Sequence, residues 1–158
     1  MVSYTHFMAA TKSALERGTG RAVVWLARQV ELVLAEQDLT LAQYRLLALL
    51  DDQPEIASAL AEKLTVSRPS VTTVVDGLVA RGLVERVTDA GDRRRVNHKL
   101  TRSGRTLIHH ADEVIETGLH TVLAHLDPVG ARGLVAGIGS LRQLTERIAV
   151  QEPAAGQS

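Results

Sequence analysis

Apolar residues recur at three- and four-residue spacing along most of the chain, and this pattern predicts a mainly helical protein. The first amphipathic stretch, residues 8–36, is expected to form a long helix, with Gly18 and Gly20 as points where it can break. Near the other end of the chain, two further stretches predict long helices, one after Thr101 and one after Asp127. Both of these residues are of the type that caps a helix N-terminus.

Three shorter helices are expected in the middle of the chain. Thr40 predicts the start of the first, because Gln43 stands at the capping-box position three residues later. A short helix over residues 57–64 follows, and only three residues separate it from a helix that Ser67 would cap. Pro69 falls in the first turn of that last helix, where a missing N–H costs nothing.

The helix that follows Ser67 has two chemically different sides. Its inward side is aliphatic: Val71, Val74, Val75 and Leu78. Its outward side is polar and rich in hydroxyls: Arg68, Ser70, Thr72, Thr73 and Asp76. Two short helices joined by a tight turn, with such a polar outer face, are typical of a helix-turn-helix whose second helix enters the major groove of DNA. An ordinary helical hairpin with a solvated polar face is the alternative.

The period changes from helical to alternating after Gly82, which predicts a two-stranded hairpin, or wing, over residues 83–88 and 95–100. Three arginines lie at or just after its tip: Arg93, Arg94 and Arg95. A guanidinium in this place can enter the narrow minor groove, where the negative potential is strongest. Asp92 is placed to fix one of them by a bidentate ion pair. By itself, an arginine run is equally typical of a solvated surface turn.

Composition narrows the class of protein. The 158 residues fit one compact unit, with four aromatic residues and no cysteine, so we expect an aliphatic core without disulfides or thiol chemistry. The sequence predicts neither a membrane span nor a signal peptide, which favours a cytoplasmic protein. Residues 62–105 contain ten Lys/Arg and five Asp/Glu, a net charge of +5, and the rest of the chain carries −5. A basic centre between acidic flanks suits a partner that is a polyanion.

Enzymes and metal proteins leave characteristic motifs that this sequence lacks. It contains no glycine-rich phosphate loop, no HExxH and no nucleophile elbow, so no catalytic residue and no cofactor are expected. His109 and His110 are adjacent on a predicted helix and point about 100° apart, so both cannot bind one ion from that helix. His98, in the wing, is expected to pack rather than to bind a metal.

Several of these segments together resemble the MarR-type (multiple-antibiotic-resistance) transcription regulators. The resemblance rests on the following segments: Leu60-Ala61-Glu62-Lys63-Leu64, Val66-Ser67-Arg68-Pro69-Ser70-Val71-Thr72, Leu78-Val79-Ala80-Arg81-Gly82-Leu83-Val84-Glu85-Arg86, Asp92-Arg93-Arg94 and Leu100-Thr101-Arg102-Ser103-Gly104. The connector 51–56 departs from the family pattern, because it is shorter than usual and lacks a polar cap for the next helix.

The resemblance implies a mainly helical winged helix-turn-helix protein that works as a homodimer on double-stranded DNA. Residues 8–36 and 105–150 would form the dimerisation helices, residues 39–104 the DNA-binding region, and residues 151–158 a disordered tail. Two winged regions would read a pseudo-palindromic operator, with Asp92 orienting Arg94 into the minor groove. The DNA-contacting residues would then be Ser67, Arg68, Pro69, Ser70, Thr72, Thr73, Asp92, Arg93, Arg94 and Arg95.

Members of such a family often release DNA when a small anionic or aromatic effector binds between the dimer helices and the winged region. Four residues are candidates for lining such a cleft: Trp25, Arg28, Tyr44 and His109. Aromatic residues on apolar helix faces are more often plain core residues, and this is the alternative for Trp25 and Tyr44. We expect a repressor. An activator, or a winged module that binds a partner protein instead of DNA, is the alternative.

Overall fold

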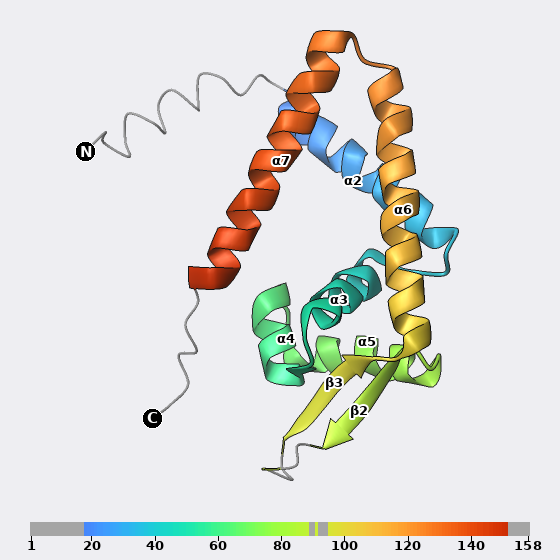
Figure 1. The fold of residues 1–158 in the computed structure, drawn as a ribbon, viewed down its shortest axis with the longest axis vertical. Helices are drawn as coiled ribbons and strands as arrows, with labels where there is room; N and C mark the ends of the chain where they lie inside the picture. Colours follow the sequence, from blue (N-terminus) through green and yellow to red (C-terminus); the bar gives the residue numbers. More distant parts are fainter. Residues whose placement is uncertain (1–17, 89–90, 92–94, 152–158) are drawn as a thin grey trace, which may run out of the picture. The chain divides into compact units, whose positions relative to one another are not determined.

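The computed structural model describes residues 18–88, 91 and 95–151 (Figure 1). The elements follow one another as α2 (Thr19–Ala35), α3 (Leu41–Asp52), β1 (Glu55–Ile56), α4 (Ala57–Leu64), α5 (Arg68–Ala80), β2 (Val84–Thr88), β3 (Val96–Leu100), α6 (Arg102–Ala124) and α7 (Pro128–Gln151). The chain divides into two compact units, residues 1–115 and 116–158, which we describe separately. The fold is mainly helical with one small sheet, as the sequence predicts.

The helix starts follow the capping residues identified in the sequence. The Gln43 N–H donates to the Thr40 hydroxyl oxygen at 3.2 Å, and the Thr40 N–H donates to the Gln43 side chain at 3.0 Å. This reciprocal pair confirms the predicted capping box of α3. Helix α2 begins directly after Gly18, whose φ of 110° is left-handed and favours glycine. The part of the predicted first helix before Gly18 lies outside the described residues.

The sheet has three antiparallel strands in the order β1-β3-β2. Strands β2 and β3 pair from Val84 with Leu100 to Thr88 with Val96, which confirms the predicted hairpin. Glu55 and Ile56 add a third strand along β3, which the sequence analysis did not predict. A two-residue strand is too short to show alternation in a sequence, so its existence depends on a partner that lies far along the chain.

Helices α3, α4 and α5 pack with the end of α2, the sheet and the first part of α6 around one aliphatic core. The residues with almost no exposed surface in this core are Leu34, Leu46, Leu47, Leu50, Leu60, Val71, Val75, Leu78, Val84, Ile108 and Ala111. Aliphatic side chains buried to this degree each contribute roughly 1.5–3 kcal/mol to folding. This core sets the position of α5 relative to the strands, and thereby the surface described below.

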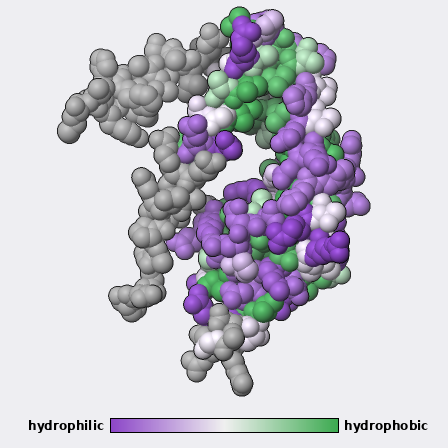
Figure 2. All heavy atoms as spheres, viewed as in Figure 1, coloured by the Kyte–Doolittle hydropathy of each residue, from purple (hydrophilic) through white to green (hydrophobic). Residues whose placement is uncertain are grey.

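The second unit consists of the end of α6 and all of α7. Asp127 caps α7, since the Val129 and Gly130 N–H groups donate to its Oδ1 at 2.8 and 3.1 Å. These two hydrogen bonds lower the pKa of the Asp127 carboxyl. Hydrophobic side chains gather on the surface around the turn between α6 and α7 (Figure 2), where Leu126 and Val129 are 42% and 72% exposed.

Candidate nucleic-acid interface

The turn between α4 and α5 holds the two helices at a fixed angle. Thr65 ends α4 in the left-handed conformation, with φ 56°, and the Val66 N–H donates to the Ala61 carbonyl at 3.0 Å. Ser67 then caps α5 by accepting from the Ser70 N–H at 3.3 Å. Both helices end on local hydrogen bonds, so the turn keeps the three-residue length that the sequence predicts.

The two sides of α5 separate as expected from the sequence. Val71, Val75 and Leu78 are buried, and Val74 is partly buried. The predicted DNA-contacting residues of this segment are all exposed: Ser67, Arg68, Pro69, Ser70, Thr72 and Thr73. The structure therefore brings these six residues together on one accessible surface, which we call the α5 face.

The two threonine hydroxyls of the α5 face are already engaged as donors. The Thr72 hydroxyl donates to the Arg68 carbonyl, and the Thr73 hydroxyl donates to the Pro69 carbonyl, each at 3.1 Å. Oxygen lone pairs and methyl groups therefore remain available to a ligand at both positions. Such a surface can accept a hydrogen bond from an exocyclic amine of adenine or cytosine, or contact a thymine methyl group.

An ion pair that sequence reasoning did not identify connects α5 with the sheet. Asp76, on the exposed side of α5, pairs with Arg86 of β2. A carboxylate near DNA would repel phosphate, so its neutralisation by Arg86 removes an unfavourable charge from the α5 face. The sequence carries no signal for this contact, because it depends on how β2 lies beside α5.

The wing is described only in part. Arg95 is exposed immediately before β3, and Gly91 is exposed in the turn. Asp92, Arg93 and Arg94 lie outside the described residues, so the predicted pairing of Asp92 with Arg94 remains a prediction. Glu85 and Lys99, which face each other across β2 and β3, form an ion pair at 3.2 Å that reinforces the hairpin.

His98 is the one polar residue of the described chain that is classed as buried, with 5% of its surface exposed. Its Nδ1 lies 3.1 Å from the Glu55 carbonyl oxygen, so the ring donates a proton to β1 from that nitrogen. Burial lowers the pKa of the His98 imidazole, against the opposing effect of this hydrogen bond. His98 packs within the sheet, as the sequence predicts.

The four candidate effector residues occupy two different environments. On α2, Trp25 is 54% exposed, so it is not a core residue of the described chain, and Arg28 pairs with Glu31 at 3.1 Å. At the junction of α3 and α6, the Tyr44 hydroxyl donates to Asp112 at 2.7 Å and His109 bonds Asp51 at 3.0 Å.

A small cavity of about 80 Å³ lies elsewhere, at the base of the α5 face. Its lining is mostly aliphatic and consists of Ala42, Arg45, Leu46, Leu64, Val66, Ser70, Val71 and Val74. None of the four effector candidates is among these residues. The Arg45 guanidinium closes one side of the cavity by donating to the Leu64 carbonyl at 3.3 Å.

Two kinds of site were searched for in the described part of the chain. Within it, no three His, Asp or Glu residues are grouped so that they could hold a metal ion. None of the helices in the ranges 18–88 and 95–151 combines the length and the apolar character that a membrane crossing requires.

Comparisons with known proteins match the winged region most strongly. The family model described as "MarR family" matches residues 39–96. The chain is 33% identical over 91 residues to the transcriptional regulator AdcR of Streptococcus pneumoniae, which is 58% of this chain and 60% of that protein. It is 32% identical over 92 residues to the HTH-type transcriptional regulator FarR of Neisseria gonorrhoeae, covering 58% of this chain and 63% of that protein. The match thus spans less than two thirds of either curated relative.

Solved structures match a larger part of the chain. Apo MarR from E. coli superposes with a TM-score of 0.68 at 22% identity, over 80% of this chain and 98% of that chain. The transcriptional repressor CouR, bound to a 23-mer DNA duplex, gives a TM-score of 0.66 at 28% identity, over 82% of this chain and 94% of that one. YusO from Bacillus subtilis gives 0.66 at 21% identity, over 89% and 98%. These likenesses extend the shared fold well beyond residues 39–96.

Proposed function

We propose, from the premise that this chain is a MarR-family winged-helix protein, that it regulates transcription by binding operator DNA as a homodimer. The observation that carries the proposal is the α5 face, on which one helix exposes Arg68 together with four hydroxyl side chains and keeps its aliphatic side in the core. A regulator of this kind binds DNA and catalyses no reaction.

The α5 face has the dimensions and chemistry of a major-groove reader. Its side chains are short near the helix N-terminus, so the helix can approach the base edges closely. Arg68, in the first turn, can reach either a guanine edge or a phosphate, and the positive end of the α5 dipole favours a phosphate. The wing arginines, of which Arg95 is exposed next to β3, would add contacts in the minor groove.

Exposed aliphatic side chains support a homodimer. In α2, Val23 and Val24 are 63% and 70% exposed, and in α7 Val135 and Leu141 are 55% and 62% exposed. Apolar patches of this kind usually mark an interface. A second copy of the chain is the occupant that the proposal assigns to them, because a two-fold dimer presents two α5 faces to the two halves of a pseudo-palindromic operator.

A repressor role and release by an effector complete the proposal. CouR, one of the solved relatives, is described as a transcriptional repressor bound to DNA. For the effector we retain a small anionic or aromatic compound, since the exposed Trp25 ring offers a stacking surface and Arg28 a positive charge on the same helix. Titration of phenolic acids into a complex with DNA tests this part, and the idea is abandoned if none of them releases the duplex.

A band-shift assay tests DNA binding directly. The probe is the DNA upstream of the protein's own gene, with unrelated competitor DNA present. We expect a specific shift that weakens steeply with salt, because each phosphate contact releases counterions. A dimer that retards no duplex at low salt would refute the proposal and favour a winged module that binds another protein.

Two arginine variants sharpen the assay. If Arg68 contacts phosphate, Arg68→Ala should reduce the slope of log K against log salt by about 0.9 per protomer, equally for all sequences. If Arg68 reads guanine, the loss should instead concentrate on operators that carry this base. Arg132→Ala, an exposed change on α7, is the matched control and should leave the slope unaltered. Arg94→Ala tests the wing and should weaken binding across operators.

A further inference from the structure

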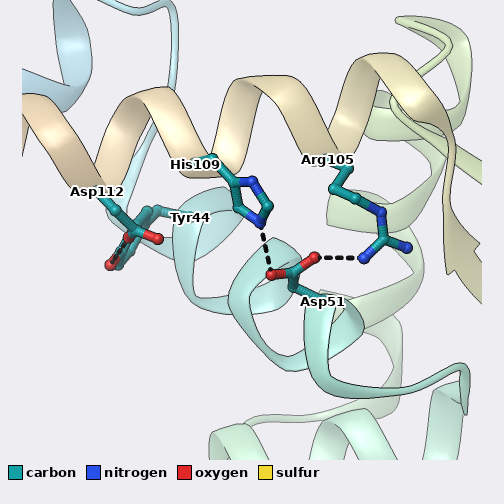
Figure 3. A network of polar contacts seen from close by, with 5 residues as sticks. All are labelled: Tyr44, Asp51, Arg105, His109 and Asp112. Atoms are coloured by element: carbon teal, nitrogen blue, oxygen red, sulfur yellow. Dashed lines mark hydrogen bonds and ion pairs between the residues drawn. The ribbon is translucent and has the colours of Figure 1, made fainter.

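A polar cluster joins α3 to α6 at two levels (Figure 3). At the first level, the Asp51 carboxylate accepts from Arg105 Nη1 at 2.8 Å and faces His109 Nε2 at 3.0 Å. At the second level, the Tyr44 hydroxyl donates to Asp112 Oδ1 at 2.7 Å. Because a carboxylate only accepts, His109 donates from Nε2, and the contact exists with a neutral ring. We call these five residues the α3–α6 clamp.

The spacing of the clamp residues determines what it can do mechanically. Tyr44 and Asp51 are seven residues apart on α3, and Arg105 and Asp112 are seven residues apart on α6, so each pair shares one helix face. Seven residues correspond to about 10 Å along a helix. One contact between two helices would act as a pivot, whereas two contacts at this separation fix the direction of one helix relative to the other.

Local stability does not explain the position of Asp51. Asp51 and Asp52 both lie in the last turn of α3, which contains no basic residue. Negative charge at a helix C-terminus is unfavourable, because it faces the negative end of the helix dipole. Asp51 is compensated by two donors from α6, while its side chain is 27% exposed. Its contribution is therefore to the placement of α6 and not to the helix that carries it.

We infer that the α3–α6 clamp sets the separation of half-sites that the dimer accepts, by fixing the direction in which α6 leaves the winged region. The inference rests on the proposed function. Helix α6 continues without interruption from Arg102 to Ala124, so about 28 Å of helix follows Arg105. A change in direction of about 7° would move its far end by about 3.4 Å, the rise of one base pair. Asp51 is thus a positioning residue that does not touch DNA.

The test compares two neighbouring carboxylates. Asp51→Asn removes the charge that holds Arg105 and His109, and Asp52→Asn removes the same charge from an exposed side chain one residue away. Each variant is assayed against duplexes that carry the selected half-sites with their separation changed in steps of one base pair. The wild type and Asp52→Asn should share one sharp optimum. For Asp51→Asn, we expect the preference over the neighbouring separations to fall roughly two- to fivefold, as loss of a partly exposed ion pair allows.

A second measurement observes the clamp without DNA. The chain has no cysteine, so Glu62→Cys places a single spin label on the exposed side of α4 in each protomer. The label-to-label distance distribution should broaden in the Asp51→Asn background and stay narrow in the Asp52→Asn background. If Asp51→Asn does not fold, Tyr44→Phe is measured in its place. That change removes only the Tyr44 hydroxyl, which donates to Asp112.

The outcomes separate the inference from the proposed function. Asp51→Asn and the wild type could show the same dependence of affinity on half-site separation and the same label-to-label distances. That result would refute the role of the α3–α6 clamp and leave the proposed DNA binding unaffected. A wild-type dimer that binds no duplex would refute the proposed function, and the distance distributions would then decide on the clamp. A monomeric wild type would overturn both.

Discussion

Replacing Gly104 by alanine should destabilise the winged region more than any exposed substitution. Gly104 lies in the first turn of α6 and is buried. A Cβ there would be 2.0 Å from the Leu83 carbonyl oxygen and 3.3 Å from Leu100 Cδ2. The same oxygen accepts from the Thr101 N–H at 3.1 Å and from its hydroxyl at 3.3 Å. The start of α6 is therefore packed against a backbone atom that cannot rotate away.

The cost follows from these contacts. Relieving the overlap requires a backbone movement of about 1 Å, and overpacking of this kind costs about 1–3 kcal/mol. The Thr101 hydroxyl donates mainly to the Gly82 carbonyl, at 2.7 Å, so only the N–H bond to Leu83 counts in full. Weakening that bond adds about 1 kcal/mol, and the better helix propensity of alanine returns up to about 1 kcal/mol. We expect Gly104→Ala to lower the free energy of unfolding by about 2 kcal/mol, or the melting temperature by about 4–8 °C.

Gly77→Ala is the matched control. Gly77 also lies in a helix of the first unit, but a Cβ there meets no atom within 4 Å. Alanine should therefore stabilise α5 by up to about 1 kcal/mol. Urea unfolding, followed by circular dichroism, compares the variants. All are measured at one protein concentration, since the stability of the proposed dimer would depend on concentration. If Gly104→Ala were as stable as Gly77→Ala, the close approach of α6 to Leu83 would be wrong.

Three further predictions concern the cap, the sheet and the α5 face. Thr40→Ala should lower the free energy of unfolding by about 1 kcal/mol, because it removes the acceptor of the α3 capping box, whereas Thr106→Ala on the exposed side of α6 should change it little. His98 has a folded-state pKa below its ordinary value, so the unfolded chain binds the proton first, and stability should fall as pH drops through about 6.5 toward the folded pKa. His98→Asn keeps a donor to Glu55 and should remove this dependence from acid unfolding curves; an unchanged slope would contradict the assignment. Thr72→Val keeps the outward methyl group but loses the acceptor oxygen, so operators selected from a random library should contain less adenine or cytosine at one position. Thr72→Ser keeps the oxygen but loses the methyl group, so the selected operators should contain less thymine there.

Much of the fold could be predicted because its signals are local. A capping residue and the amide it binds lie within three positions of each other, so Thr40, Ser67, Thr101 and Asp127 identify their helices from sequence. The buried and exposed sides of α5 follow from its period. The turn between α4 and α5 is also local. Its left-handed position is occupied by Thr65 and not by glycine, so the sequence does not mark that conformation.

The features that sequence reasoning missed all depend on distant partners. Strand β1 forms because Glu55 meets His98, 43 residues later. The Asp76–Arg86 pair and the α3–α6 clamp likewise join separate elements, the latter across 54 to 68 residues. For Trp25, the sequence allowed either a core position or a position in an effector cleft. Its exposure on α2 excludes the core position in the described chain and does not test the cleft.

These long-range contacts share one property that bears on function. Local rules make three positions unfavourable: Asp51 at a helix C-terminus, Asp76 on a surface that would face phosphate, and His98 buried in the sheet. Each is compensated by a partner on another element: Arg105, Arg86 and the Glu55 backbone. Residues that are unfavourable in their local structure, and are compensated by a partner far along the chain, are expected at functional positions. The three contacts join α6 to α3, α5 to β2 and β3 to β1, so they fix the α5 face and the start of α6 within the first unit. The proposed binding of two copies to one operator would depend on these placements.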